Sequence, residues 1–258
     1  MKLSSRALII IPLLTALSGG AFAQTLLTAG DLLIVERINN GTPDSFKFVP
    51  LVDLSVGTVI YFTDNGWTGS QFRGASATDG DGNENLTKFT AAAPISAGTL
   101  ISSTAATFAI TGSIPGSTTG SFASLAQAAT GGEQIYAFQT TGGNASVTNP
   151  LFASGAQTHL YVLDDSNGFE NATSSNTGNV TPGLTAGATA LTFNTAVAGT
   201  IALNNDGATR NKAQWGAYAS NFSNWSTTPI TSNLTIPEPG TLALAGLGLL
   251  GLALRRRK

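Results

Sequence analysis

Short runs of alternating hydrophobic and polar residues recur from residue 31 to residue 203, and turns rich in Gly, Asn and Ser separate them. Alternation with a period of two is typical of β-strands, and helical periodicity is scarce in this chain. One short helix is predicted within residues 210–225. Many short strands with turns between them indicate an all-β fold, either a sandwich or a barrel. The predicted strands are residues 31–38, 45–54, 58–63, 86–90, 99–103, 107–111, 134–140, 159–163, 189–193 and 200–203.

Pro50 lies inside the second predicted strand. Proline has no backbone N–H to donate to a ladder, so we expect an edge strand or a bulged strand at this position. No repeat of fixed period is visible in the sequence, which argues against a solenoid or a propeller. The pattern therefore favours one β-domain whose strands differ in length and spacing.

The first residues have the three parts of a Sec-type signal peptide. Two basic residues, at positions 2 and 6, precede an apolar stretch at residues 7–17 that is too short for a membrane span. Ala21 and Ala23 form a small-x-small cleavage site, so Gln24 is the predicted mature N-terminus. We therefore expect residues 1–23 to be removed on export.

Residues 24–236 remain when both ends of the chain are set aside, and they contain no Cys. The segment must rely on a hydrophobic core rather than on disulfides, and it is long enough to form one. It holds six Lys and Arg against thirteen Asp and Glu, which gives a net charge near −7, whereas the whole chain has −2. Nucleic-acid binding needs a basic surface, so the composition argues against a nucleic-acid partner.

The C-terminal end of the chain combines a short motif, an apolar stretch and a basic cluster. Residues 240–254 are uncharged and mainly apolar, and as a helix they would reach about 22 Å, against roughly 30 Å for a bilayer core. Basic residues stay on the cytoplasmic side of a membrane, so the preceding domain would lie outside. The motif is Pro237-Glu238-Pro239, and the basic cluster is Arg255, Arg256, Arg257 and Lys258.

This order of triplet, short span and basic end resembles the PEP-CTERM sorting signal of Gram-negative bacteria. The resemblance implies recognition and removal of the tail by an exosortase-type membrane protease, with a cut near the triplet and a transient anchor in the inner membrane. It implies a mature form at the cell surface or in the extracellular matrix of a biofilm. The predicted organisation is a signal peptide at 1–23, a β-sandwich ectodomain at 24–227, a linker at 228–236 and the sorting signal at 237–258.

Residues 46–73, together with "NFSNWST" at residues 221–227, resemble secreted bacterial β-sandwich proteins related to the lamin-tail type of immunoglobulin-like domain. The most specific piece is "GTVIYFTDNGW" at residues 57–67. The resemblance implies an immunoglobulin-like sandwich with an adhesive or structural role, and it carries over no catalytic residue. A short C-terminal membrane helix completes the predicted fold.

Few side chains in the predicted ectodomain are suited to catalysis. His159 is its sole His, and without Cys partners a closed zinc site is not expected, so we predict a structural or surface role. Asp164 and Asp165 could form an acid pair for glycoside hydrolysis, but neighbouring strand residues point to opposite faces. We therefore predict no enzyme activity, and a secreted hydrolase is the least favoured alternative.

One acidic loop offers oxygen atoms at alternating positions, a pattern that can wrap Ca²⁺. Its spacing is not that of an EF-hand, and the competing interpretation is a solvated turn. Trp67 and Trp225 are candidates for exposed aromatic rings that stack on a sugar, although a Trp beside a turn can also fill the end of a sandwich. The candidate Ca²⁺ ligands are Asp79, Asp81, Asn83 and Asn85.

The sequence thus predicts an exported, non-enzymatic protein of the cell surface or matrix with no required cofactor. The alternative is a Ca²⁺-assisted carbohydrate-binding or adhesion module, whose partner would be an extracellular polysaccharide. Both hypotheses share the predicted export and the predicted exosortase processing. They differ in whether residues 79–85 hold an ion.

Overall fold

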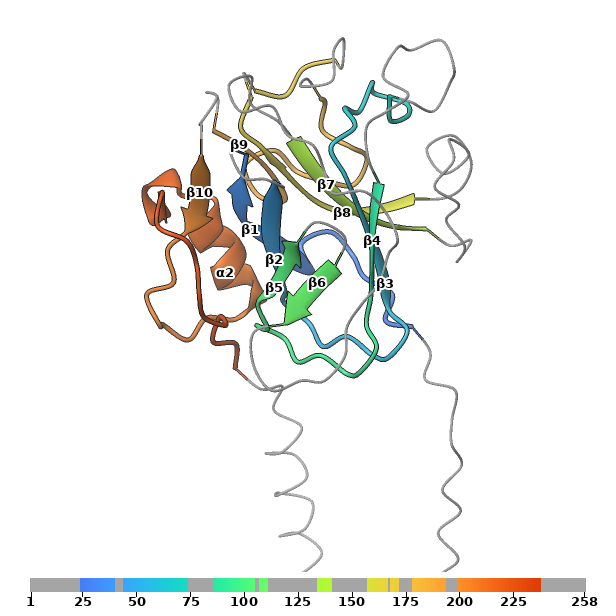
Figure 1. Cartoon of the computed structure of the whole chain (residues 1–258). Helices are drawn as coiled ribbons and strands as arrows, with labels where there is room; N and C mark the ends of the chain where they lie inside the picture. Colours follow the sequence, from blue (N-terminus) through green and yellow to red (C-terminus); the bar gives the residue numbers. More distant parts are fainter. Residues whose placement is uncertain are drawn as a thin grey trace, which may run out of the picture.

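The computed structural model describes residues 24–39, 44–73, 86–104, 107–110, 134–140, 157–166, 168–171, 178–193 and 199–237. These residues form two β-sheets that face each other, with one short α-helix at the side (Figure 1). The all-β prediction is confirmed at the level of two sheets and little helix. Ten of the strands overlap the ten ranges that the alternating pattern predicts.

The first sheet has six strands in the order β11-β10-β1-β2-β5-β6. Every described pairing within it is antiparallel. Its central strand, β1, is buried along almost its whole length. The strands are β1 (Leu32–Ile38), β2 (Ser45–Pro50), β5 (Ile101–Thr104), β6 (Thr107–Ile110), β10 (Thr200–Leu203) and β11 (Trp225–Ser226).

The second sheet has five strands in the order β4-β3-β7-β8-β9. Its last pair, β8 with β9, is parallel, whereas the other pairs are antiparallel. A parallel pair needs a long crossover connection, and here residues 165–189 provide it. The strands are β3 (Val59–Thr63), β4 (Leu86–Thr90), β7 (Gln134–Thr140), β8 (Gln157–Asp164) and β9 (Ala190–Thr192).

Aromatic side chains from both sheets meet in the core between them. Phe46 and Phe48 of β2 each lie 4.8 Å, centroid to centroid, from the ring of Phe62 on β3. Phe48 also packs edge-on against Phe89 of β4 at 5.2 Å. The period-two spacing of Phe46 and Phe48 places both rings on the inner face of β2, as the alternating pattern predicts.

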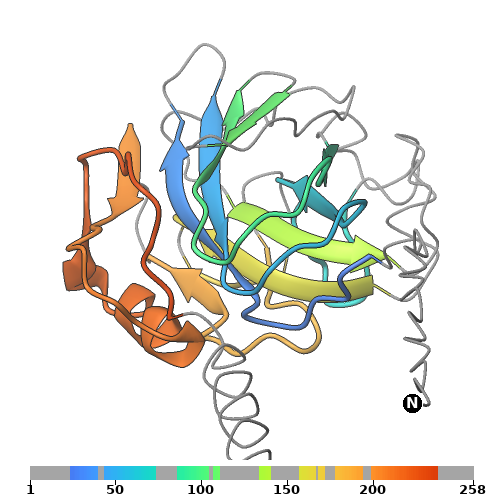
Figure 2. The same ribbon diagram turned by 90° about the horizontal axis from the view of Figure 1, so that it is seen from below.

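Helix α2 (Lys212–Ala219) and the C-terminal segment, which we define as residues 228–236, lie side by side on one side of the sandwich (Figure 2). The helix begins with a capping box, in which the Asn211 side chain accepts from the Gln214 N–H and the Gln214 side chain accepts from the Asn211 N–H. Its buried residues are Trp215 and Ala219. This extra layer covers part of β1, which explains why the strand does not alternate between buried and exposed residues.

The prediction of an edge strand or a bulged strand at Pro50 is wrong on both counts. Strand β2 lies between β1 and β5, so the prediction of an edge strand is wrong. The register between the two strands does shift between Ile34 and Glu36, but the extra residue belongs to β1 and lies opposite Lys47 and Phe48 rather than at Pro50. Pro50 is the last residue of β2, so its missing N–H interrupts no further ladder bond, and its carbonyl accepts from the Gly98 N–H.

Several predicted segments lie outside the described residues. They include the signal peptide, the acidic loop at residues 79–85, and the tail from Glu238 to the end of the chain. Within the described part of the chain, no helix has both the length and the apolar character that a bilayer crossing requires. The short membrane helix predicted at residues 240–254 therefore stays a prediction.

Candidate functional site

The C-terminal segment, assigned to a linker from its sequence, is held against the sandwich by a buried carboxylate. Glu36 of β1 is fully buried, and its Oε2 accepts from the backbone N–H of Ile230 at 2.7 Å. Lys47 of β2 lies 2.9 Å from Oε1 of Glu36 and donates to the Ile230 carbonyl at 2.7 Å. The two charges therefore compensate each other and bind the backbone N–H and the backbone carbonyl of one residue, Ile230.

A glycine makes the next contact possible. The Gly98 N–H donates to the Pro50 carbonyl, and the Gly98 carbonyl accepts from the Leu234 N–H, both at 2.8 Å. Gly98 has φ +88°, and a Cβ at this position would clash with the carbonyl oxygen of Leu234. Only glycine suits both the backbone angle and the close approach of the two chains. Leu234 itself is buried in the core.

The last backbone contacts of this segment involve Thr235. Its carbonyl accepts from the indole N–H of Trp215 and from the backbone N–H of Arg210, both at 3.1 Å. The Arg210 guanidinium in turn lies 4.7 Å from the centroid of the Trp215 ring and 3.9 Å from that of Tyr218. Residues 228–236 are thus part of the packed domain rather than a free spacer, and Pro237 is the next residue.

The comparisons with known proteins concern this same end of the chain. Residues 235–258 match the family model of the PEP-CTERM protein-sorting motif. The match supports an exported protein whose C-terminal anchoring signal is processed by an exosortase, a membrane protease. No curated protein and no solved structure matches the chain. The match therefore describes the sorting of this protein, and the chemistry of its domain must be judged from the structure.

The predicted sorting and cleavage residues lie at the borders of the described part. Pro237 is described and exposed, whereas Glu238, Pro239 and the basic cluster are not described. At the other end Gln24 is the first described residue, and the two predicted cleavage alanines precede it. The predicted Ca²⁺ ligands are also outside the described residues. Among those that are described, no three His, Asp or Glu side chains come together as a metal site.

The two carboxylates at the end of β8 have different partners. Asp165 forms a buried ion pair with Arg37 of β1, which links the two sheets. Asp164 accepts from the backbone N–H of Ser166 at 2.7 Å, and burial raises the pKa of its carboxyl. Each aspartate is only 1% exposed. This arrangement holds the strand end in place and does not form a pair of carboxylates across an open cleft.

His159 of β8 lies inside a cluster of aromatic rings that come from β7 and from the segment after β3. Its ring centroid is 5.0 Å from that of Trp67, 5.8 Å from Phe72 and 6.3 Å from Phe138. Burial lowers the pKa of His159 to about 4, so the imidazole is neutral at pH 7. Of the two predicted roles for His159, structural and surface, the geometry favours the structural one.

The two tryptophans proposed for sugar stacking are not exposed. Trp67 packs edge-on against Phe72 at 5.0 Å. Trp225 donates its indole N–H to the Ala219 carbonyl at 2.7 Å and lies edge-on to Phe193. Both side chains are buried, Trp67 in a second hydrophobic cluster with Tyr61 and Tyr136, and Trp225 in the main core. Packing inside the protein, the competing interpretation for Trp67, agrees with its position, and Trp225 is buried as well.

Proposed function

We propose that this protein is an exported, non-enzymatic component of the cell surface or extracellular matrix. In this proposal the domain reaches its destination through the PEP-CTERM tail and is released with its C-terminal segment still bound. One observation carries the proposal. The hydrogen bonds of the domain continue to Thr235, two residues before the first proline of the sorting triplet. The protease then meets a folded domain followed at once by its motif, so the cut falls on the C-terminal side of Ile236.

The state of the candidate catalytic groups supports a non-enzymatic role. His159 is buried among rings, Asp165 is paired with Arg37, and Asp164 is buried beside Ser166. A hydrolase needs carboxylates that reach a bound substrate and a water molecule. The three described candidates are instead enclosed by other side chains or bound to them, and none faces an open cleft.

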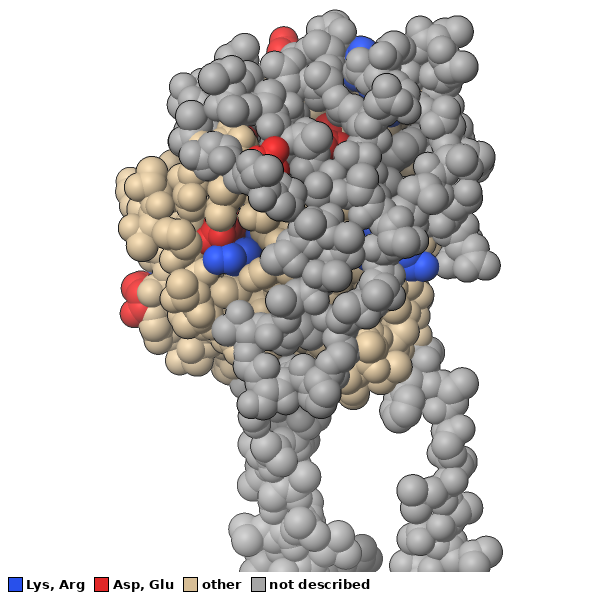
Figure 3. Space-filling view, viewed as in Figure 1, with Lys and Arg blue, Asp and Glu red and all other residues tan. Residues whose placement is uncertain are grey.

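The surface charge supports a role in contact with uncharged material. On the face shown in Figure 3, Lys and Arg side chains are scattered over the described surface and form no continuous basic patch. Charged residues make up only 10% of the chain. Such a surface is suited to neutral partners, for example polysaccharide, more than to nucleic acid.

The proposal is tested by fractionating cells with and without their exosortase. We expect the processed protein outside the cell only when the protease is present, and mass spectrometry should place its new C-terminus beyond Ile236. Alanine replacement of Pro237, Glu238 and Pro239 should leave the tail uncut, whereas Thr231→Ala, an exposed change in the same segment, should have no effect. A full-length protein that stays in the cytoplasm, or a cut on the N-terminal side of Ile236, would contradict the proposal.

A further inference from the structure

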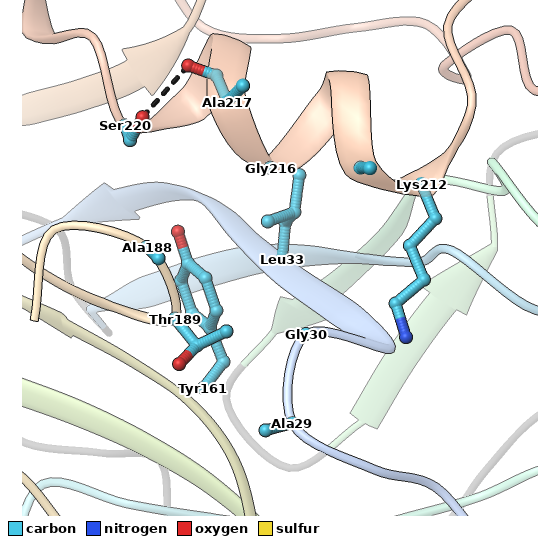
Figure 4. Close-up of a pocket in the computed structure, with 11 residues that line it drawn as sticks. Ala29, Gly30, Leu33, Tyr161, Ala188, Thr189, Lys212, Gly216, Ala217 and Ser220 are labelled. Carbon is cyan, nitrogen blue, oxygen red and sulfur yellow. Dashed lines mark hydrogen bonds between the residues drawn. The ribbon is translucent and has the colours of Figure 1, made fainter. Parts of the chain in front are cut away.

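A hollow of about 410 Å³ lies between helix α2 and the two sheets (Figure 4). Leu33 of β1 and Tyr161 of β8 form its floor, and Thr189 lies beside them. Its volume falls within the range of roughly 300–1,000 Å³ that is typical of small-molecule sites. The PEP-CTERM match and the proposed function assign no role to it.

The hollow exists because the residues that face it are small. Gly216 is at its centre on the helix, and a Cβ built on this residue meets no atom within 4 Å. Side chains of ordinary size would fill the space between a helix and a sheet, as they do elsewhere in this core. The small lining residues are Ala29, Gly30, Ala188, Ala213, Gly216 and Ala217.

The helix is fixed at both ends, so it does not move inward to close this space. At its start, Lys212 forms an ion pair with Asp31, which precedes β1. Near its middle, the indole of Trp215 donates to the carbonyl of Thr235. At its end, the carbonyl of Ala219 accepts from the indole of Trp225. The hollow is therefore a built feature of the fold and not a packing defect beside a loose helix.

The hydroxyl of Tyr161 is the polar group of the lining that can form a hydrogen bond with a bound molecule. The side chain is 0% exposed, and its hydroxyl has no hydrogen-bond partner among the described atoms. In Figure 4 the hydroxyl points toward α2, near Gly216 and Ser220. Burial raises the pKa of this phenol, so it stays neutral and keeps its proton. It is thus suited to donate a hydrogen bond to an acceptor inside the hollow.

The other polar groups of the lining are already engaged. The Ser220 hydroxyl donates to the Ala217 carbonyl at 2.9 Å, and the Thr189 hydroxyl oxygen accepts from the Thr185 N–H at 2.8 Å. Lys212 is neutralised by Asp31. A molecule in the hollow therefore meets a mainly apolar wall, the Tyr161 hydroxyl, which has no partner among the described atoms, and no uncompensated charge.

We propose that this hollow binds a small neutral molecule with a hydrocarbon or aromatic body and a single hydrogen-bond acceptor, such as a ketone or ester carbonyl. The apolar body contacts Leu33 and the small residues of α2, and the acceptor receives the Tyr161 hydroxyl. Charged molecules are excluded, because burial of an ion without a partner is unfavourable. The proposal does not depend on how the protein is sorted.

The test uses the full chain in lipid nanodiscs and isothermal titration calorimetry, with the heat of empty nanodiscs subtracted. Three probes distinguish the contributions of the aromatic body, the acceptor and charge. Acetophenone has an aromatic body and a carbonyl acceptor, cumene has a similar shape without the acceptor, and benzoate is charged. We expect saturable binding of acetophenone, weaker binding of cumene and none of benzoate. Tyr161→Phe should weaken acetophenone roughly 3- to 10-fold and leave cumene unchanged, because it removes one hydrogen bond and keeps the ring.

Two further variants complete the design. Gly216→Leu keeps a residue that is compatible with the helix and fills the hollow, so it should abolish binding of both neutral probes. Tyr218→Phe, on the same helix and outside the lining, is the matched control and should bind like the parent chain. Binding that survives Gly216→Leu, equal losses of acetophenone and cumene in Tyr161→Phe, or no saturable heat from any probe would overturn the proposal.

Discussion

His159 should make the folded domain sensitive to acid. Its ring is only 6% exposed among three aromatic side chains, and burial lowers the pKa of His159 from 6.5 to about 4. The unfolded chain would therefore bind a proton near pH 6.5, whereas the folded domain would not bind it until about pH 4. Between these values the unfolded state holds more protons, so the free energy of unfolding falls as the pH falls.

The size of the effect follows from the shift. One pKa unit corresponds to about 1.4 kcal/mol, so a shift of about 2.5 units corresponds to about 3 kcal/mol over the whole window. The stabilisation is fully present above about pH 6.5 and is lost by about pH 4. Between pH 7 and pH 4.5 the expected loss is about 2 kcal/mol, a large share of the 5–15 kcal/mol of a typical domain.

Asp164 acts in the opposite direction, so the histidine must be isolated by substitution. Burial raises the pKa of the Asp164 carboxyl, so the folded domain keeps this proton to a higher pH than the unfolded chain does. Its contribution to stability therefore grows as the pH falls. His159→Phe removes one titration, keeps an aromatic ring in the cluster and leaves Asp164 in place. The difference between the two proteins then reports on His159 alone.

The assay is urea unfolding at pH 7 and at pH 4.5, followed by tryptophan fluorescence, with the parent chain and His159→Phe measured side by side. We expect the parent chain to lose about 2 kcal/mol more than the variant between the two pH values. His159→Leu serves as a second non-titrating variant in case the larger ring disturbs the packing. If both variants lose as much stability as the parent chain, burial of a neutral His159 is not the cause of the acid sensitivity.

Three further predictions concern other parts of the chain. Glu36→Ala leaves a peptide N–H and a lysine without their shared carboxylate, so we expect a loss of about 3 kcal/mol and earlier proteolysis of the C-terminal segment. Gly98→Ala should lower the free energy of unfolding in urea by about 3 kcal/mol, because its Cβ would clash with Leu234. Gly57 has φ +81° and open space around it, so Gly57→Ala should lower the same quantity by only about 1 kcal/mol. Equal losses would exclude the clash with Leu234. Calorimetry with millimolar Ca²⁺ tests the loop at residues 79–85, and the absence of heat would end the Ca²⁺ hypothesis.

Much of the secondary structure could be predicted because it depends on local patterns. Strand β2 alternates Phe46 and Phe48 toward the core, and β3 is rich in β-branched and aromatic residues. Such runs favour strands whatever their partners are. The two-residue strand β11 was not predicted, because a segment of this length has no periodicity to detect. The same limit applies to the parallel pairing of β8 with β9, which depends on a connection and not on either strand.

The buried charges could not be predicted, because their partners are distant in the sequence. Arg37 lies 128 positions from Asp165, and Glu36 lies 194 positions from Ile230. In the sequence, Glu36 and Arg37 interrupt an apolar run and resemble solvent-facing positions of a strand. The fold instead covers both faces of β1, so each charge needs a compensating partner. The hollow under α2 is equally non-local, since its lining comes from four separate parts of the chain.

The position of the sorting motif illustrates how the two kinds of information combine. The order of triplet, apolar stretch and basic cluster is a local pattern, and the match at residues 235–258 confirms it as a PEP-CTERM motif. The fold adds where the motif begins relative to the domain. Thr235 makes the last backbone hydrogen bonds, and Pro237, which has no N–H, cannot extend the pattern. If the proposed function is correct, a stable C-terminal segment therefore also sets how close to the domain the protease can cut.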